Sequence, residues 1–216
     1  MQLEYILPHE IERRSFEMIA EELGERMPPE EIRPIVMRCI HTTADFDYAE
    51  NLYFSENVLT VAEHAIREGA LFVTDTNMAK SGINKTALAR HGCEVACFMA
   101  DADVAETAKT NGTTRAAASV DKAAALGRQI IYVVGNAPTA LMQLCEHIRT
   151  GDFTPALVIG MPVGFVNVVQ SKELLIETGV PCIVARGRKG GSNVAAAVCN
   201  AILYGLDAKN NLQKVQ

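Results

Sequence analysis

The chain of 216 residues contains no tryptophan, and aromatic residues make up only 6% of it. It also lacks long hydrophobic runs. The longest apolar stretches, such as 130–134 and 194–199, are far shorter than the roughly 20 residues of a membrane-spanning helix. The N-terminus shows neither a basic region nor an apolar signal stretch. We therefore expect a cytoplasmic protein with no membrane partner.

Positive charge is scarce as well. The 20 Lys and Arg residues face 26 Asp and Glu residues, which gives a formal net charge of −6. A general nucleic-acid binder would instead show a basic face. We expect no nucleic-acid partner, and an anionic ligand would need positive groups gathered locally.

The cysteines do not show the paired spacing of a zinc site. Most of the six lie in apolar runs, where a free thiol packs as a small hydrophobic group; they are Cys39, Cys93, Cys97, Cys145, Cys182 and Cys199. Cys93 and Cys97 beside His91 could be imagined as metal ligands, but no second pair completes the set. We expect reduced thiols and no metal.

Common nucleotide and hydrolase motifs are also missing. The chain has no G-x-G-x-x-G after its first predicted strand, no G-x-x-x-x-G-K-[ST] and no G-x-S-x-G. Residues 187–192 resemble a phosphate loop in composition only. A Rossmann-like transferase or oxidoreductase that uses a nucleotide therefore remains only as an alternative.

What is present is a change of pattern near residue 69. Before it we predict helices at 9–24, from Pro28 through His41, and at 56–68. Beyond it, short apolar runs alternate with helical stretches, which is typical of a parallel sheet covered on both faces. The predicted strands are 70–74, 93–99, 130–134, 156–160 and 181–185, and the predicted helices are 83–90, one near 104, 116–126, 139–148, 171–178 and 192–204.

These patterns predict one domain over residues 1–216. Its fold class is α/β, a three-layer α/β/α arrangement with a mainly parallel sheet of about five strands and an N-terminal helical segment. Residues 1–69 are mainly helical, 70–206 alternate between strand and helix, and 207–216 form a polar tail that frays.

Four segments that leave the predicted strands suggest a ligand edge: 74–78, 135–139, 160–165 and 186–192. Ligands of parallel sheets bind beyond the carboxyl ends of the strands, and glycines permit close backbone approach. Thr139 and Ser192 stand where helix N-termini offer free N–H groups to an anion. Any short strand–helix turn uses Gly, Pro and Asn, so each segment alone has that simpler explanation.

His41 is the candidate for acid–base chemistry. Apolar residues recur at three- and four-residue spacing from Ile32 to Ile40, so His41 falls near a helix C-terminus, where the carbonyl dipoles favour a protonated ring. Such a histidine can donate a proton near neutral pH. Arg38 lies on nearly the same face and could hold an anion beside it. A histidine packed against its own helix is the alternative.

Taken together, three motifs resemble those of precorrin-8X methylmutase (precorrin isomerase) and its cobalt-precorrin-8 counterpart. They are R-C-I-H-T-T-A-D at 38–45, G-M-P-V-G-F-V-N at 160–167 and R-G-R-K-G-G-S at 186–192. Segments 73–78 and 114–118 also match, and the resemblance extends from about Tyr5 to Tyr204. No single motif is specific, but the ordered set is.

The resemblance implies an isomerase of cobalamin biosynthesis. It would move a methyl group from C11 to C12 of (cobalt-)precorrin-8, giving hydrogenobyrinate or cobyrinate, without a cofactor and as a homodimer with its site near the subunit interface. The family's catalytic histidine matches His41, and its substrate contacts match Ser15, Arg38 and Arg115. We add further candidate substrate contacts from their positions: Arg14, Thr42, Arg186, Arg188 and Lys189.

The chemistry of these residue types fits this activity. A methyl shift between neighbouring ring carbons consumes no redox equivalents, so one histidine that lends a proton suffices, with a gain of about 10²–10⁴-fold. Carboxylates on the substrate would favour imidazolium. A tetrapyrrole carrier without catalysis would share Arg115 and the basic loop but would not need His41 as an acid. Whether the substrate holds cobalt is left open.

Overall fold

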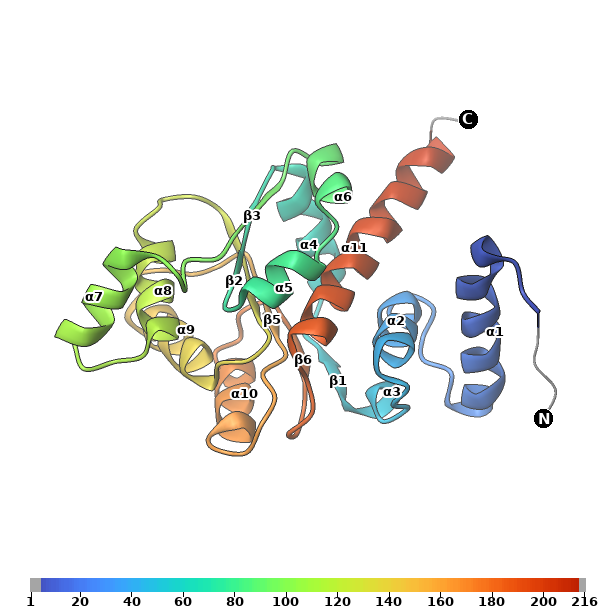
Figure 1. The fold of residues 1–216 in the computed structure, drawn as a ribbon, viewed down its shortest axis with the longest axis horizontal. Coiled ribbons are helices and arrows are strands. Elements are labelled where there is room, and N and C mark those ends of the chain that lie inside the picture. Colours follow the sequence, from blue (N-terminus) through green and yellow to red (C-terminus); the bar gives the residue numbers. More distant parts are fainter. Residues whose placement is uncertain (1–4, 214–216) are drawn as a thin grey trace.

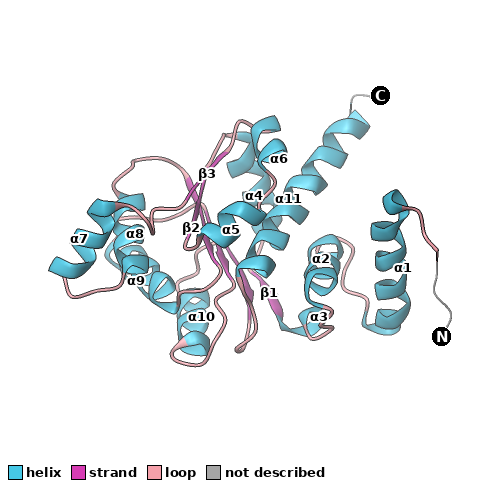
Figure 2. Ribbon diagram, viewed as in Figure 1, coloured by secondary structure: helices cyan, strands magenta, loops and turns pink. Residues whose placement is uncertain are grey.

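The computed structural model describes residues 5–213 and has three layers, with helices on both faces of a six-stranded sheet (Figures 1 and 2). The strand order is β1-β6-β5-β4-β2-β3. Five strands are parallel and β1 runs antiparallel to β6. The strands are β1 (Leu52–Phe54), β2 (Leu71–Thr74), β3 (Glu94–Ala96), β4 (Ile130–Val134), β5 (Leu157–Gly160) and β6 (Cys182–Ala185).

The predicted three-layer class and the five parallel strands are confirmed. The sixth strand, β1, was not predicted, because residues 52–54 fall in the part expected to be mainly helical. Three residues are too few to show an alternating pattern. β1 exists through its pairing with β6, in which Leu52 lies opposite Ala185.

Successive residues of each central strand enter two separate cores. Ile131 and Val133 of β4 pack into one core, and Ile130, Tyr132 and Val134 into the other. This is the period of two that a strand imposes on its side chains. Because both faces are covered, β2, β4, β5 and β6 are buried along their whole length, as their continuous apolar runs predicted.

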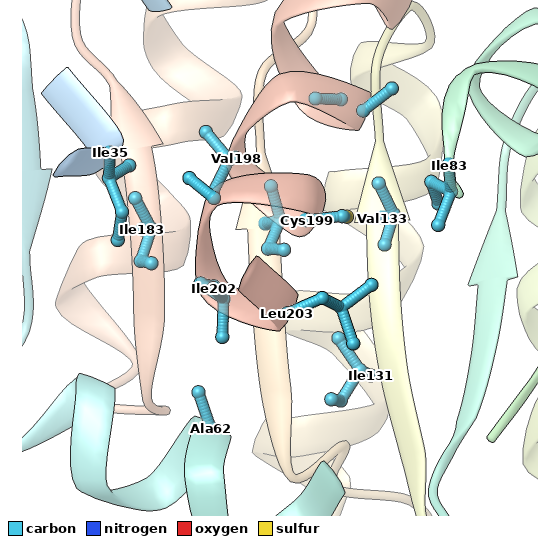
Figure 3. Close-up of a cluster of buried hydrophobic side chains, with 14 of the residues drawn as sticks. Ile35, Ala62, Ile83, Ile131, Val133, Ile183, Val198, Cys199, Ile202 and Leu203 are labelled. Atoms are coloured by element: carbon cyan, nitrogen blue, oxygen red, sulfur yellow. The ribbon is translucent and has the colours of Figure 1, made fainter. Parts of the chain in front are cut away.

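Two groups of helices cover the two faces of the sheet, and each group packs on its own hydrophobic core (Figure 1). The first group is α2 (Arg33–Thr43), α4 (Val58–Arg67), α5 (Asn77–Gly82), α6 (Lys85–Arg90) and α11 (Ser192–Gln213); the second is α8 (Arg115–Ala124), α9 (Pro138–Thr150) and α10 (Val168–Glu177). Helix α7 (Ala102–Thr110) packs on α8 in a small cluster of its own. Helix α11 buries Val198, Cys199 and Leu203 against the strands (Figure 3).

The first helix, α1 (Ile11–Leu23), lies outside the helix layers that cover the sheet (Figure 1). Helix α1, flanked by the short 3-10 turns η1 (Pro8–Glu10) and η2 (Gly24–Arg26), packs on α2, and α3 (Tyr48–Asn51) leads from α2 to β1. The predicted start of the His41 helix at Pro28 was wrong, because α2 begins at Arg33. Pro34 has no N–H and must lie in a first turn, so the helix cannot begin a full turn earlier.

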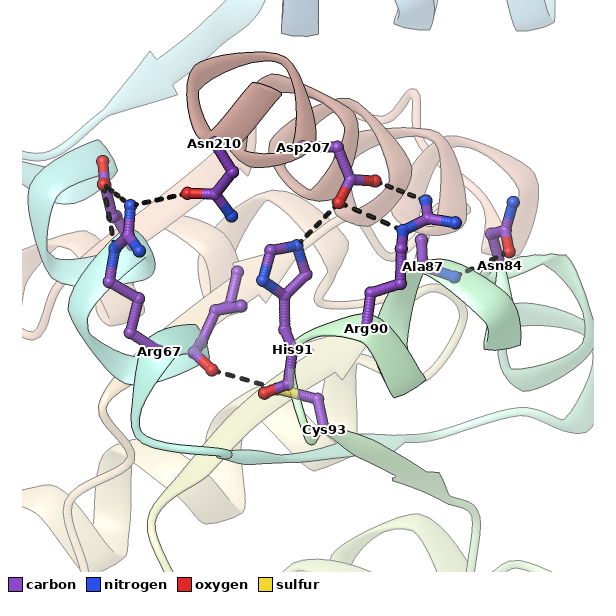
Figure 4. A network of polar contacts seen from close by, with 10 residues as sticks. Arg67, Asn84, Ala87, Arg90, His91, Cys93, Asp207 and Asn210 are labelled. Atoms are coloured by element: carbon purple, nitrogen blue, oxygen red, sulfur yellow. Dashed lines mark hydrogen bonds and ion pairs between the residues drawn. The ribbon is translucent and has the colours of Figure 1, made fainter. Parts of the chain in front are cut away.

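The prediction that residues 207–216 fray was also wrong as far as the described chain extends, since α11 continues to Gln213. Its end is held by side chains of α4 and α6 (Figure 4). Arg90 donates to Asp207, and His91 Nε2 lies 3.1 Å from Asp207 Oδ1. Arg67 donates to Asn210 at 3.2 Å. Residues 214–216 of the predicted tail, like residues 1–4, lie outside the described residues.

Of the cysteines, Cys39, Cys93, Cys145, Cys182 and Cys199 are buried, Cys97 is half-buried, and all are free. Between residues 5 and 213, no three His, Cys, Asp or Glu side chains gather in a way that could hold a metal ion. No helix in that range is both long and apolar enough to cross a membrane.

Candidate functional site

The loops at the carboxyl edge of the sheet are bonded to one another. The Asp75 carboxylate, directly after β2, accepts N–H bonds from Gly135, Asn136 and Ala137 at 2.7–2.8 Å. The hydroxyls of Thr76 and Ser192 lie 2.8 Å apart. The turn after β5 joins the loop after β6, since Gly164 donates its N–H to the Arg188 carbonyl and Gly191 donates to the Met161 carbonyl. All four predicted ligand segments are therefore one connected assembly.

Two glycines in these loops allow the loops to touch each other. A Cβ on Gly135 would lie 2.6 Å from Ser192 Cα, and one on Gly190 would lie 2.7 Å from the Pro162 carbonyl oxygen. Real side chains do not approach so closely. We predicted that glycines in these loops make room for a ligand. At Gly135 and Gly190 the missing side chain instead lets one loop pack against another.

His41 occupies the last turn of α2, as predicted. The helix ends at Ala44, whose backbone is left-handed (φ 53°) and whose N–H donates to Ile40 at 2.7 Å. The imidazole is exposed and stacks on Phe16 of α1, with ring centroids 5.2 Å apart. His41 is thus held by a neighbouring helix while its ring stays accessible, as a proton donor requires. Thr42 beside it is also exposed.

Arg38 sits one turn before His41 between two aromatic rings. Its guanidinium lies 5.2 Å from the ring centroids of both Phe16 and Tyr204, and Nη1 lies 2.8 Å from Glu12 Oε1. Such contacts fix the direction of a guanidinium. An anion that binds at Arg38 would have to compete with the exposed Glu12 carboxylate.

The α1 candidates are engaged within their own helix. The Ser15 hydroxyl donates to the Ile11 carbonyl at 2.9 Å, and Arg14 lies 3.8 Å from Glu17 and 3.9 Å from Glu21. Ser15 is next to Phe16, which contacts His41. The packing of α1 on α2 therefore places Ser15 on the helix that contacts the predicted histidine.

Lys189 connects the turn after α2 with the basic loop after β6. Its Nζ lies 2.6 Å from carboxylate oxygens of both Asp45 and Asp47. These two carboxylates raise the pKa of Lys189, and Lys189 lowers the pKa of Asp45. The basic loop is thereby fastened beside the segment that carries His41, and the charge of Lys189 is already matched.

A second lysine anchors the same loop from beneath, and sequence reasoning missed it. Lys172 of α10 is fully buried and donates to the carbonyls of Gly187 (2.9 Å) and Lys189 (2.8 Å). Burial lowers its pKa to about 8. In the sequence it is one lysine among helix residues, and no local signal separates it from a solvated one.

The buried Lys172 leads to a prediction about stability and pH. Its pKa is about 8 when folded and about 10.4 in an unfolded chain. Between these values the unfolded chain keeps a proton that the folded chain has lost, so the free energy of unfolding rises with pH. We expect wild type to gain up to about 3 kcal/mol relative to Lys172→Met from pH 8 to 10.5.

Urea unfolding at pH 7, 9 and 10 measures this difference. Lys109→Met, at an exposed position of α7, is the matched control and should follow wild type at each pH. A constant difference in the free energy of unfolding between wild type and Lys172→Met across this range would contradict the prediction.

The two arginines of the basic loop each lie on an aromatic ring. Arg186 lies 5.1 Å from the centroid of Tyr53 and 3.5 Å from Glu173. Arg188 lies 5.4 Å from the centroid of Phe165. Unlike Arg186, Arg188 has no acidic partner among residues 5–213, so its charge is available to a ligand.

Arg115 belongs to a second part of the edge. It is exposed at the start of α8, where Thr114 accepts an N–H bond from Ala117 and donates to Thr139 at 2.9 Å. Thr139 lies in the first turn of α9, after β4. Within the described chain no contact joins Arg115 to His41 or Arg38, so the structure does not bring all predicted site residues together.

A surface hollow of about 730 Å³ lies elsewhere. It is lined by the start of α2, by β1 and α4, and by the C-terminal half of α11. None of the predicted site residues lines it. The candidate site is instead an open edge formed by His41, its neighbours and the loops.

The family of the chain follows from comparison with known proteins. The family model for precorrin-8X methylmutase matches residues 10–205. A cobalt-precorrin-8 methylmutase of Priestia megaterium is 45% identical over 197 residues, which is 91% of this chain and 88% of the relative. A precorrin-8X methylmutase of Pseudomonas aeruginosa is 36% identical over 194 residues, 89% of this chain and 93% of the relative.

A solved structure agrees. The crystal structure of a precorrin-8x methyl mutase from Thermus thermophilus matches with a TM-score of 0.81 and 40% identity, over 93% of this chain and 98% of that one. The fold and these relatives define the class as a methylmutase, an isomerase of cobalamin biosynthesis. The chain belongs to the precorrin-8X methylmutase family, and the resemblance found in its motifs is confirmed.

Proposed function

We propose that this protein moves the methyl group from C11 to C12 of precorrin-8 or cobalt-precorrin-8, with His41 as proton donor and acceptor. The observation that carries the proposal is the accessible His41 ring at the end of α2, stacked on Phe16. A proton given to the conjugated ring makes it electron-poor, the methyl group migrates, and the proton returns to His41.

The alternatives have lost support. A nucleotide-dependent transferase or a carrier without catalysis would not be expected to belong to a family of methylmutases. A cytoplasmic location stays a prediction from the sequence.

Incubation of the purified protein with each substrate form tests the proposed function. Absorbance spectra should show conversion of precorrin-8 to hydrogenobyrinate, of cobalt-precorrin-8 to cobyrinate, or of both. The relative named for the cobalt form is more similar than the one named for precorrin-8X, so the cobalt form is the first to test. Spectra unchanged with either form would overturn the proposal.

For the substrate contacts we propose Ser15, Arg38 and Arg115, together with Arg14, Thr42, Arg186 and Arg188. Arginine suits a carboxylate-rich macrocycle because its planar guanidinium binds carboxylates through two hydrogen bonds. Lys189 was expected among them. Its pairing with Asp45 and Asp47 supports a role in holding the basic loop in place.

We expect Arg115→Ala and Arg188→Ala each to weaken macrocycle binding, and rising salt to weaken binding by wild type more than by either variant. Absorbance titration at low and high ionic strength measures both effects. Arg128→Ala is the control, because Arg128 precedes β4 at the opposite edge of the sheet and pairs with Glu94. If the affinity for the macrocycle changes neither with salt concentration nor on either substitution, apolar contacts hold the ligand instead.

We further propose a homodimer whose interface completes the site. The separation of Arg115 from helices α1 and α2 supports this proposal, because a second copy could supply the part of the binding site that one chain lacks. We expect sedimentation to give the mass of two chains at micromolar concentration. A monomeric mass together with full activity would contradict the dimer.

A further inference from the structure

The turn between β5 and α10 exposes an unusual amount of apolar surface. Phe165 and Val166 are each 80% exposed and Val163 is 45% exposed, so three large apolar side chains lie within four residues. Single exposed apolar residues are ordinary, but a contiguous group commonly marks a binding surface.

This turn is held firmly against the basic loop. Gly164 donates its N–H to the Arg188 carbonyl at 3.2 Å, and Gly191 donates to the Met161 carbonyl at 2.7 Å. Lys172 holds the carbonyls on both sides of Arg188. The exposed side chains therefore stand on a fixed backbone.

The turn combines an apolar face with one positive charge. The Arg188 guanidinium lies 5.4 Å from the Phe165 ring centroid, and it has no acidic partner in the described part of the chain. Lys189, the next residue, is fastened to Asp45 and Asp47 after the His41 helix. The Phe165 and Arg188 side chains are thus exposed on loops that Lys189 ties to the segment after His41.

We propose that residues 163–166 form an apolar wall against the ring of the macrocycle, with Arg188 placed beside it for a peripheral carboxylate. This inference rests on the proposed function and adds a positioning element to it. A flat conjugated ring with carboxylates at its rim matches an aromatic side chain with an adjacent guanidinium. A second copy of the chain is the competing occupant, and such a self-contact would not need the macrocycle.

Titration of the protein with cobyrinate and with hydrogenobyrinate, followed by absorbance, tests the inference. We expect Phe165→Ser to weaken binding about tenfold, which corresponds to roughly 1.4 kcal/mol, and Phe165→Leu to weaken it less because an apolar surface remains. Phe165→Ser should cost less affinity in an Arg188→Ala background, because the two side chains contact each other. Met142→Ser, exposed on α9, is the control and should bind like wild type.

Sedimentation of the same variants separates the two occupants. If Phe165→Ser has the same mass in sedimentation as wild type but binds the macrocycle more weakly, the result supports residues 163–166 as a wall against the macrocycle. Unchanged affinity in Phe165→Ser, or a fall in mass that accounts for the lost affinity, would overturn it. If wild type converts substrate while Phe165→Ser binds normally, only this inference fails; if wild type neither binds nor converts, the proposed function fails as well.

Discussion

His41→Ala is expected to lower turnover by about 10²–10⁴-fold while the protein still folds and binds the macrocycle. The loss follows because no other proton donor would replace the exposed imidazole. Folding should persist, since an exposed side chain contributes little core packing, and the stacking on Phe16 is a single surface contact. Single-turnover absorbance kinetics with saturating substrate measure the chemical step apart from binding.

The matched control is His64→Ala, an exposed histidine of α4 near Glu68, which should leave turnover unchanged. Added free imidazole should partly restore His41→Ala, because the vacated position opens to solvent. Near-normal turnover in His41→Ala would remove the acid mechanism but would leave the methylmutase family assignment standing.

Asp75→Ala is expected to reduce the free energy of unfolding by roughly 3 kcal/mol or more. The buried carboxylate satisfies three backbone N–H groups of the loop after β4. Removal leaves those donors without a partner, and each buried unpaired group costs about 1–3 kcal/mol. The total is smaller than three such penalties, because the loop can shift so that some of these N–H groups bind water.

The protonation state of Asp75 supports this expectation. Burial raises its pKa, and the three N–H donors oppose that rise. All three contacts are donors, so the ionised carboxylate fits the site best. Urea unfolding at pH 7 gives the free energy, with Glu106→Ala on the exposed side of α7 as the control. A loss below about 1 kcal/mol, the size of an average substitution, would show that the loop does not depend on Asp75.

Much of the fold was accessible from local pattern. Apolar β-branched runs such as 130–134 identified the five parallel strands, because a strand covered on both faces must be apolar throughout. The spacing that ends at Ile40 placed His41 in the last turn of its helix. The ordered motifs also gave the family, since their order along the chain is itself sequence information.

Other features were invisible to local pattern. Strand β1 is too short to show a period, and the start of α2 was misplaced because two prolines before it resembled a helix start. In the sequence Lys172 resembles an ordinary surface lysine, because the carbonyls it binds belong to the loop after β6. The turn with Phe165 was predicted as a ligand segment, but the exposure of its apolar side chains and the position of Arg188 beside Phe165 appear only in the tertiary structure.

The sequence by itself therefore determined the layered α/β class and the position of His41 on its helix, because these follow from short apolar patterns, and it determined the family, because the order of the motifs is written along the chain. The tertiary structure decided which charges are free and which loops touch. Lys189 and Asp47 are 142 residues apart in the chain, and Thr76 and Ser192 are 116 apart. Such pairs exist only after the sheet has brought its strand ends to one edge, so no local pattern can encode them.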